Sequence, residues 1–192
     1  STQAKTLFPY TTLFRSTVPT DATTGCPTIS AFGGGATGYL TQVDFGSSVA
    51  CRLKIFDLLW KGGAYAFNAS TSGNSPTSFS SRVPGGTDFG DTQIWCEQVT
   101  AGTLVQNVAV TYTNQAGTTG RSTGTVAAPA AMIVGRMFQL PLQAGDTGVQ
   151  GVTGVVGSVA SAGTFNILVM RPVWSGRVRI INDGDTDRKS VV

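Results

Sequence analysis

Histidine is absent from this 192-residue sequence, and charges of both signs are scarce. The lack of imidazole excludes histidine-based catalysis, histidine metal ligands and a histidine pH switch. Charged residues make up 12% of the chain, about half the usual share of roughly 25%. Cys26, Cys51 and Cys96 are widely spaced, which indicates neither a disulfide framework nor a metal finger. Apolar runs stay shorter than the roughly 18 residues of a membrane-spanning helix, so we expect no membrane partner.

The chain is instead rich in glycine, threonine and serine, and 41% of its residues are hydrophobic. This composition favours short strands and turns over a helical bundle or a disordered tail. Residues 92–100 and 104–113 alternate in polarity, residues 164–170 form an apolar run, and residues 143–148 read QAGDTG, which is typical of a tight turn. The sequence therefore predicts a mainly β fold, an antiparallel β-sandwich or jelly roll with about seven short strands.

One short α-helix is predicted over residues 47–60. Val49, Leu53, Phe56 and Trp60 fall on one apolar stripe at helical spacing. A strand is the alternative, because the other apolar residues of this segment do not keep the helical spacing.

The two ends of the chain differ from its body. Residues 6–16, TLFPYTTLFRS, resemble the translation of a common sequencing adapter, and residues 187–192, DRKSVV, resemble the translation of its reverse complement. We interpret residues 1–16 and 187–192 as artefactual segments. The remaining prediction is a flexible arm or linker over residues 17–46 and a β-sandwich domain over residues 47–186.

The basic character of the chain belongs to these ends. The whole sequence has 13 basic and 10 acidic residues, a net charge of +3, whereas residues 17–186 hold nine of each sign. The difference comes from Lys5, Arg15, Arg188, Lys189 and Asp187. A body of zero net charge offers no basic patch, so we expect no nucleic-acid partner.

Two glycine motifs match functional patterns only in spacing. Residues 33–38 fit the dinucleotide pattern GxGxxG, but an extended-looking segment follows them, so we interpret them as linker. Residues 120–124 fit the nucleophile pattern GxSxG, but without histidine the usual triad cannot form. We interpret this second motif as a glycine turn between strands.

The acidic residues give no clear site. Two carboxylates could act together as the acid and base of a glycan hydrolase, but solvated loop residues are the preferred interpretation. Residues 182–187 resemble a short calcium loop without the glutamate that closes it. We therefore expect no catalytic residues, no metal site, no cofactor and no enzymatic activity. The carboxylates considered are Asp44, Asp57, Asp88, Asp91, Glu97 and Asp146.

Three stretches together carry a family resemblance: residues 54–60, KIFDLLW; residues 110–121, VTYTNQAGTTGR; and residues 135–149, GRMFQLPLQAGDTGV. In this order they resemble a group of uncharacterised virion structural proteins of tailed bacteriophages. The resemblance implies a particle component without catalytic residues.

The leading hypothesis is a capsid decoration or cement protein on the virion surface. It would form a homo-oligomer, with a trimer favoured, and contact the major capsid protein. Apolar and aromatic residues anchor such contacts, and the candidates are Phe32, Trp95, Phe138 and Trp174. The alternative is a tail-fibre or baseplate module that binds a host glycan.

Overall fold

The chain divides into two compact units, which are described separately. The larger unit is Lys54–Trp174, and the smaller one combines Ser1–Leu53 with Ser175–Val192. The computed structural model describes residues 42–72, 79–102, 104–128, 133–157, 162–178 and 184–187.

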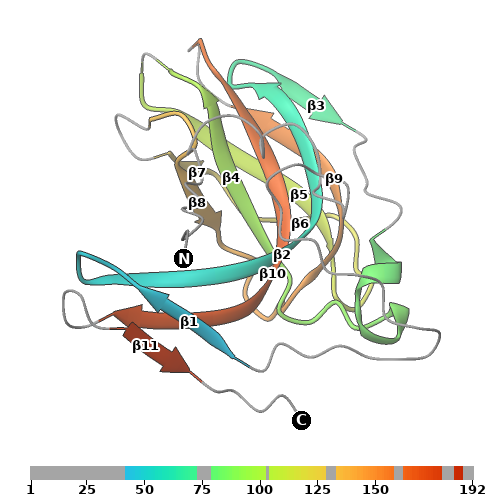
Figure 1. The fold of residues 1–192 in the computed structure, drawn as a ribbon. Helices are drawn as coiled ribbons and strands as arrows, with labels where there is room; N and C mark the ends of the chain where they lie inside the picture. The colour runs from blue at the N-terminus through green and yellow to red at the C-terminus, as the bar shows by residue number, and fades with distance from the viewer. Residues whose placement is uncertain are drawn as a thin grey trace. The chain divides into compact units, whose positions relative to one another are not determined.

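Two antiparallel sheets make up most of the larger unit (Figure 1). The first has the order β2 (Cys51–Ala66), β10 (Thr164–Val178), β4 (Gln93–Thr100) and β8 (Met137–Leu140), and β2 and β10 extend beyond the bounds of the unit. The second has the order β3 (Ser70–Ser72), β9 (Val149–Gly157), β5 (Asn107–Asn114) and β6 (Arg121–Ser122), and β7 (Val126–Ala127) also pairs with β5.

The chain passes repeatedly from one sheet to the other. The strands β2, β4, β8 and β10 belong to the first sheet, while β3, β5, β6, β7 and β9 belong to the second. This interleaving of two antiparallel sheets is a jelly roll. The predicted mainly β fold is confirmed.

Inward-facing side chains of both sheets form one core. Ile94 and Cys96 of β4 and Val108, Val110 and Tyr112 of β5 are fully buried. The alternation predicted for residues 92–100 and 104–113 is therefore confirmed. The core also holds Phe67 and Phe165, whose ring centroids lie 4.4 Å apart.

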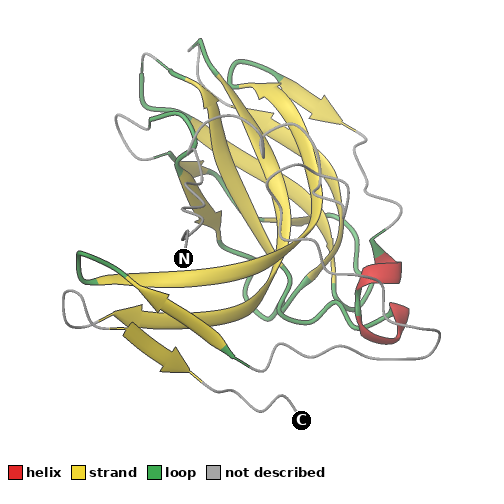
Figure 2. Ribbon diagram, in the orientation of Figure 1, coloured by secondary structure: helices red, strands yellow, loops and turns green. Residues whose placement is uncertain are grey.

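The predicted helix over residues 47–60 is wrong, because Cys51–Ala66 form the long strand β2. The expected apolar stripe does not bury as a unit, since Val49 is 60% and Leu53 is 37% exposed. Pairing with β10, which comes far later in the sequence, overrides the local helical spacing. Within the described residues the helical segments are two 3-10 turns, Ser80–Arg82 and Pro84–Gly86 (Figure 2). A search of the same residues found no helix that could span a membrane.

The described part of the smaller unit includes a two-stranded antiparallel ribbon. Strand β1 (Val43–Gly46) pairs with β11 (Gly184–Asp187), with Val43 opposite Asp187. The last residues of the predicted arm are thus a strand, and residues 17–41 lie outside the described residues. The segment compared with a calcium loop is likewise a strand over its described part. The larger unit is shorter than the predicted domain of residues 47–186.

Candidate functional site

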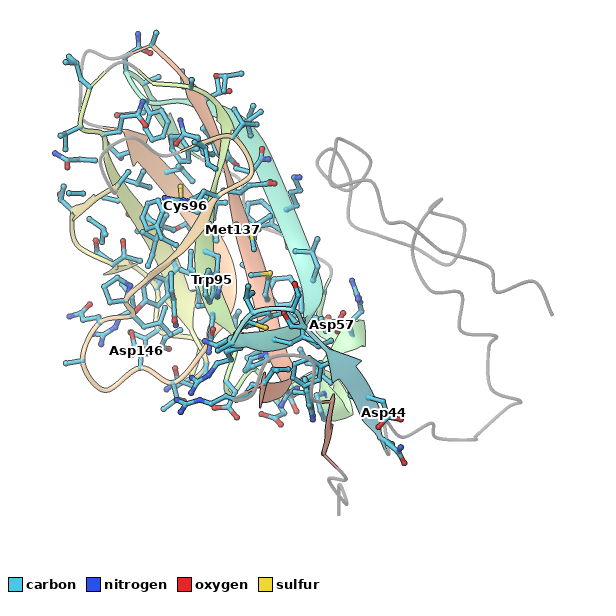
Figure 3. All side chains as sticks on the ribbon, turned by 60° about the vertical axis from the view of Figure 1, so that its left-hand side comes forward. Asp44, Asp57, Trp95, Cys96, Met137 and Asp146 are labelled. Atoms are coloured by element: carbon cyan, nitrogen blue, oxygen red, sulfur yellow. The ribbon has the colours of Figure 1, made fainter. Side chains whose placement is uncertain are left out.

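Trp95 lies on the face of β4 that points away from the core, because its neighbours Ile94 and Cys96 face inward (Figure 3). Its half-buried ring meets Phe56 of β2 edge to face, with ring centroids 5.3 Å apart. The indole Nε1–H donates to Gln93 Oε1 at 3.0 Å. Both contacts fix the orientation of a ring that keeps part of its surface in solvent.

The other predicted interface residues differ in exposure. Phe138 of β8 is half-buried and packs against the core. Trp174 of β10 is only 6% exposed, so its own chain leaves it little surface for a partner. Phe32 lies outside the described residues. Trp95 and Phe138 sit on neighbouring strands, but Phe138 is opposite Cys96 and so belongs to the core side of the sheet.

A buried ion pair joins three strands of the first sheet. Lys61 Nζ lies 3.2 Å from Glu97 Oε2, and Asn166 Nδ2 donates to the same oxygen at 2.8 Å. The Lys61 and Glu97 side chains are 5% and 11% exposed. Because lysine and asparagine compensate the carboxylate, this charge can be kept away from water. The group ties β2, β4 and β10 together.

Asp146 is the centre of a second polar cluster. Arg121 donates two hydrogen bonds to the Asp146 carboxylate, from Nε at 2.8 Å and from Nη2 at 3.0 Å. The Tyr112 hydroxyl and Asn114 Nδ2 each donate at 2.7 Å. Asp146 thus receives four hydrogen bonds from the end of β5 and from β6, although its side chain is only 3% exposed.

The cluster shifts the acidity of two groups. Hydrogen bonds from Arg121, joined by those from Tyr112 and Asn114, lower the pKa of Asp146 from 3.8 to about 2 against the opposing effect of desolvation. Burial, followed by the hydrogen bond to Asp146, raises the pKa of Tyr112 to about 12. Asp146 is therefore a fixed anion and Tyr112 a fixed donor at neutral pH, which suits a structural role rather than proton transfer.

The side chains of Asn114 and Gln115, beside the Asp146 cluster, bind backbone amides of two turns. Asn114 Oδ1 accepts from the amides of Ala116 at 3.1 Å and Thr118 at 2.9 Å. Gln115 Oε1 accepts from the amides of Thr147 at 3.0 Å and Gly148 at 3.2 Å. These turns lie within the stretches 110–121 and 135–149 that carry the family resemblance, so their polar residues position loops.

The GxSxG motif is not a nucleophile elbow, because the element that directly follows it is the short strand β7 and not a helix. Arg121–Ser122 form β6 and pair with β5, and the flanking Gly120 and Gly124 adopt φ values of +71° and +67°. These left-handed conformations favour glycine. The segment is a short strand between glycine turns, in line with the predicted interpretation. The GxGxxG motif of residues 33–38 lies outside the described residues.

Four described carboxylates of the larger unit, those of Asp57, Asp88, Glu97 and Asp146, contact cations. Arg82 donates to Asp57, and Arg171 donates to Asp88 at 3.2 Å. Solvation is the wrong interpretation for Glu97 and Asp146, whose side chains are buried in ion pairs. Among the described residues, no three histidine, cysteine or acidic side chains gather into a possible metal site. Burial raises the pKa of the Cys96 thiol, so this cysteine stays protonated and apolar.

Sequence reasoning missed a group of exposed apolar side chains in the loops. Leu104 and Ile133 are 63% exposed, Val105 is 56% exposed and Val134 is 40% exposed. The available signal was the placement of two adjacent apolar pairs in glycine-containing segments that lack charged residues. Such exposed residues are informative when they occur together.

Comparisons of the chain with protein-family models, curated proteins and solved structures found no match.

Proposed function

We propose that this chain is a virion structural protein of a tailed bacteriophage, a capsid decoration protein that stabilises the shell through protein–protein contacts. The observation that carries the proposal is the jelly roll, an architecture that viral capsid proteins use repeatedly. Fold alone does not determine function. The second support is therefore the sequence resemblance over residues 54–60, 110–121 and 135–149.

The distribution of charge is consistent with such a role. Glu97 and Asp146 form ion pairs within the chain, with Lys61 and Arg121. A surface with few unpaired charges loses little hydration energy when a neighbour covers it. We propose that copies bind around symmetry axes of the capsid as homo-oligomers, with a trimer favoured, and clamp adjacent major capsid subunits. No catalytic residue or cofactor is part of this proposal.

The test compares capsids of the encoding phage with and without this chain. Genome release on heating is followed with a DNA-binding dye, and complete capsids should release DNA at a higher temperature than depleted ones. Adding the purified chain back should restore the difference. Equal release temperatures in all three preparations would contradict the cement role.

A glycan-binding tail module is the second candidate, and Trp95 is the observation that favours it. Aromatic rings suit the apolar faces of sugars, and jelly rolls also occur in lectins. Here the ring is held by Phe56 and sits beside the Gln93 amide. Glycan-array binding that is lost in Trp95→Ala but kept in Val156→Ala, a change at an exposed position of β9, would support this candidate.

A further inference from the structure

Charged residues of the larger unit lie at one end of strand β5. Asn114, the last residue of β5, contacts Asp146, which Arg121 also binds. The turn around Asp146 lies beside the segment that precedes β4, because the Asp91 amide donates to the Thr147 carbonyl at 2.8 Å. That segment also contains the Asp88 partner of Arg171. Figure 3 shows Asp146 in the loops at this end.

Three other connections meet at the opposite end, where β5 begins. The Gly135 amide donates to the Gln98 carbonyl at 2.8 Å, and the Gln98 amide donates to the Arg136 carbonyl at 3.0 Å. These two hydrogen bonds attach the segment that precedes β8 to the last part of β4. The Gln106 side chain donates to the Ala162 carbonyl at 3.2 Å, which adds the approach to β10. The β4–β5, β7–β8 and β9–β10 connections therefore share one end.

This end is almost free of charge. The sequence has no charged residue over 98–120, 122–135 or 147–170, and Arg136 is the one charged residue that these hydrogen bonds bring to the described part of this end. The four exposed apolar side chains found in the loops, Leu104, Val105, Ile133 and Val134, lie here. We name these four residues the charge-free end, and the exposed Arg136 beside them is not included.

We propose that the charge-free end is the surface through which copies of this chain associate. In a symmetric oligomer the same surface of each copy approaches the others around an axis. A charged side chain on that surface would therefore lie near the same side chain of another copy and be repelled by it. The four apolar side chains carry no charge, so they can meet the same side chains of another copy without repulsion, and they gain free energy when they leave water. The occupant that fits is therefore a second copy of the chain. The inference deepens the proposed function and rests on it for its biological setting, but it can be tested without a capsid.

The experiment measures the mass of the full-length chain in solution by sedimentation velocity over a range of concentrations. We expect the wild type to form an oligomer of its 19.8 kDa chain. Leu104→Asp and Ile133→Asp should each raise the dissociation constant by about 100-fold, because they place like charges together. Val173→Asp is the matched control, since Val173 is 49% exposed on β10 outside the charge-free end, and it should associate as the wild type does.

Thermal unfolding monitors the fold of each variant, and amide hydrogen exchange gives an independent measure on the wild type. Protection of residues 104–106 and 133–136 should rise with chain concentration. A wild type that stays monomeric, or Asp variants that associate unchanged, would overturn the inference. Asp variants that remain oligomeric but lose capsid binding would assign the surface to a capsid partner instead. An oligomer that depends on Leu104 and Ile133 but never binds capsids would support the inference and contradict the proposed function.

Discussion

Asp146 shows how a single carboxylate can organise two loops. It accepts hydrogen bonds from Arg121, Tyr112 and Asn114, which lie on strands or turns far earlier in the sequence. The tight turn at residues 143–148 could be predicted from its glycine and polar residues. The burial of its aspartate could not, because Arg121 becomes its neighbour only when β6 pairs with β5.

The lowered pKa of Asp146 makes a prediction about acid stability. Its pKa is 3.8 unperturbed and about 2 in the folded chain, so below pH 3.8 the unfolded state takes up the proton first. The contribution of Asp146 to stability is thus present above pH 3.8 and is lost as the pH falls towards 2. Urea unfolding between neutral pH and this range should show that loss. Asp146→Asn should be less stable at neutral pH and show a smaller acid-dependent loss, and an unchanged pH profile in this variant would contradict the assignment.

Removing the Tyr112 hydroxyl tests the same cluster without changing charge. Tyr112→Phe removes the donor to Asp146 and the acceptor for the Gln143 amide, which lies 2.8 Å away. Because one of these hydrogen bonds involves a carboxylate, we expect the unfolding free energy to fall by about 1.5–3 kcal/mol. In an Asp146→Asn background the same change should cost less. Equal costs in both backgrounds would mean that the two side chains are not coupled.

At the scale of the element, the strands differ in how well local sequence predicts them. Strands β4 and β5 alternate because one face lies in the core, and the alternating polarity of residues 92–100 and 104–113 predicted this alternation. Residues 47–60 were wrongly predicted as a helix. A helix and a strand would each bring some of their apolar residues onto one face, and only the pairing with β10 selects the strand. Strand β10 extends from Thr164 to Val178, beyond the predicted 164–170, because Arg171 and Pro172 interrupt its apolar run without ending the strand.

Strand β10 also offers a test of the core. Phe165 is fully buried and contacts the rings of Tyr65 and Phe67, with centroids 5.8 and 4.4 Å away. Phe165→Ala should lower the unfolding free energy by about 3–5 kcal/mol, because it removes this packing and leaves a cavity. Phe138→Ala is the matched control in the first sheet and should cost less, since Phe138 is only half-buried. Denaturant unfolding of both variants measures the difference, and a cost at Phe165 no larger than at Phe138 would show that the core is centred elsewhere.

For the whole molecule, low charge, abundant glycine and alternating strands were sufficient to predict a mainly β sandwich. They could not locate surfaces for association, because those depend on which loops meet at an end. Leu104 and Ile133 belong to two connections that hydrogen bonds of Gln98 and Gln106 bring to the same end, and no periodicity in either loop reveals this.

The interpretation of residues 1–16 as artefactual makes a prediction at this scale. Every residue of the hydrophobic core cluster lies within Lys54–Trp174. A variant that lacks residues 1–16 should therefore unfold at the same urea concentration as the full-length chain. A clear loss of stability in this variant would show that the segment contributes to the fold.

The Asp146 cluster lies at one end of strand β5 and the bare apolar loops lie at the other, and this separation has a consequence for assembly. If copies join only at the apolar end, the other end stays hydrated and cannot act as a docking point for the next copy. Growth by repeated head-to-tail addition, which produces filaments, is then blocked. Under this proposal the assembly closes at a small, fixed number of subunits.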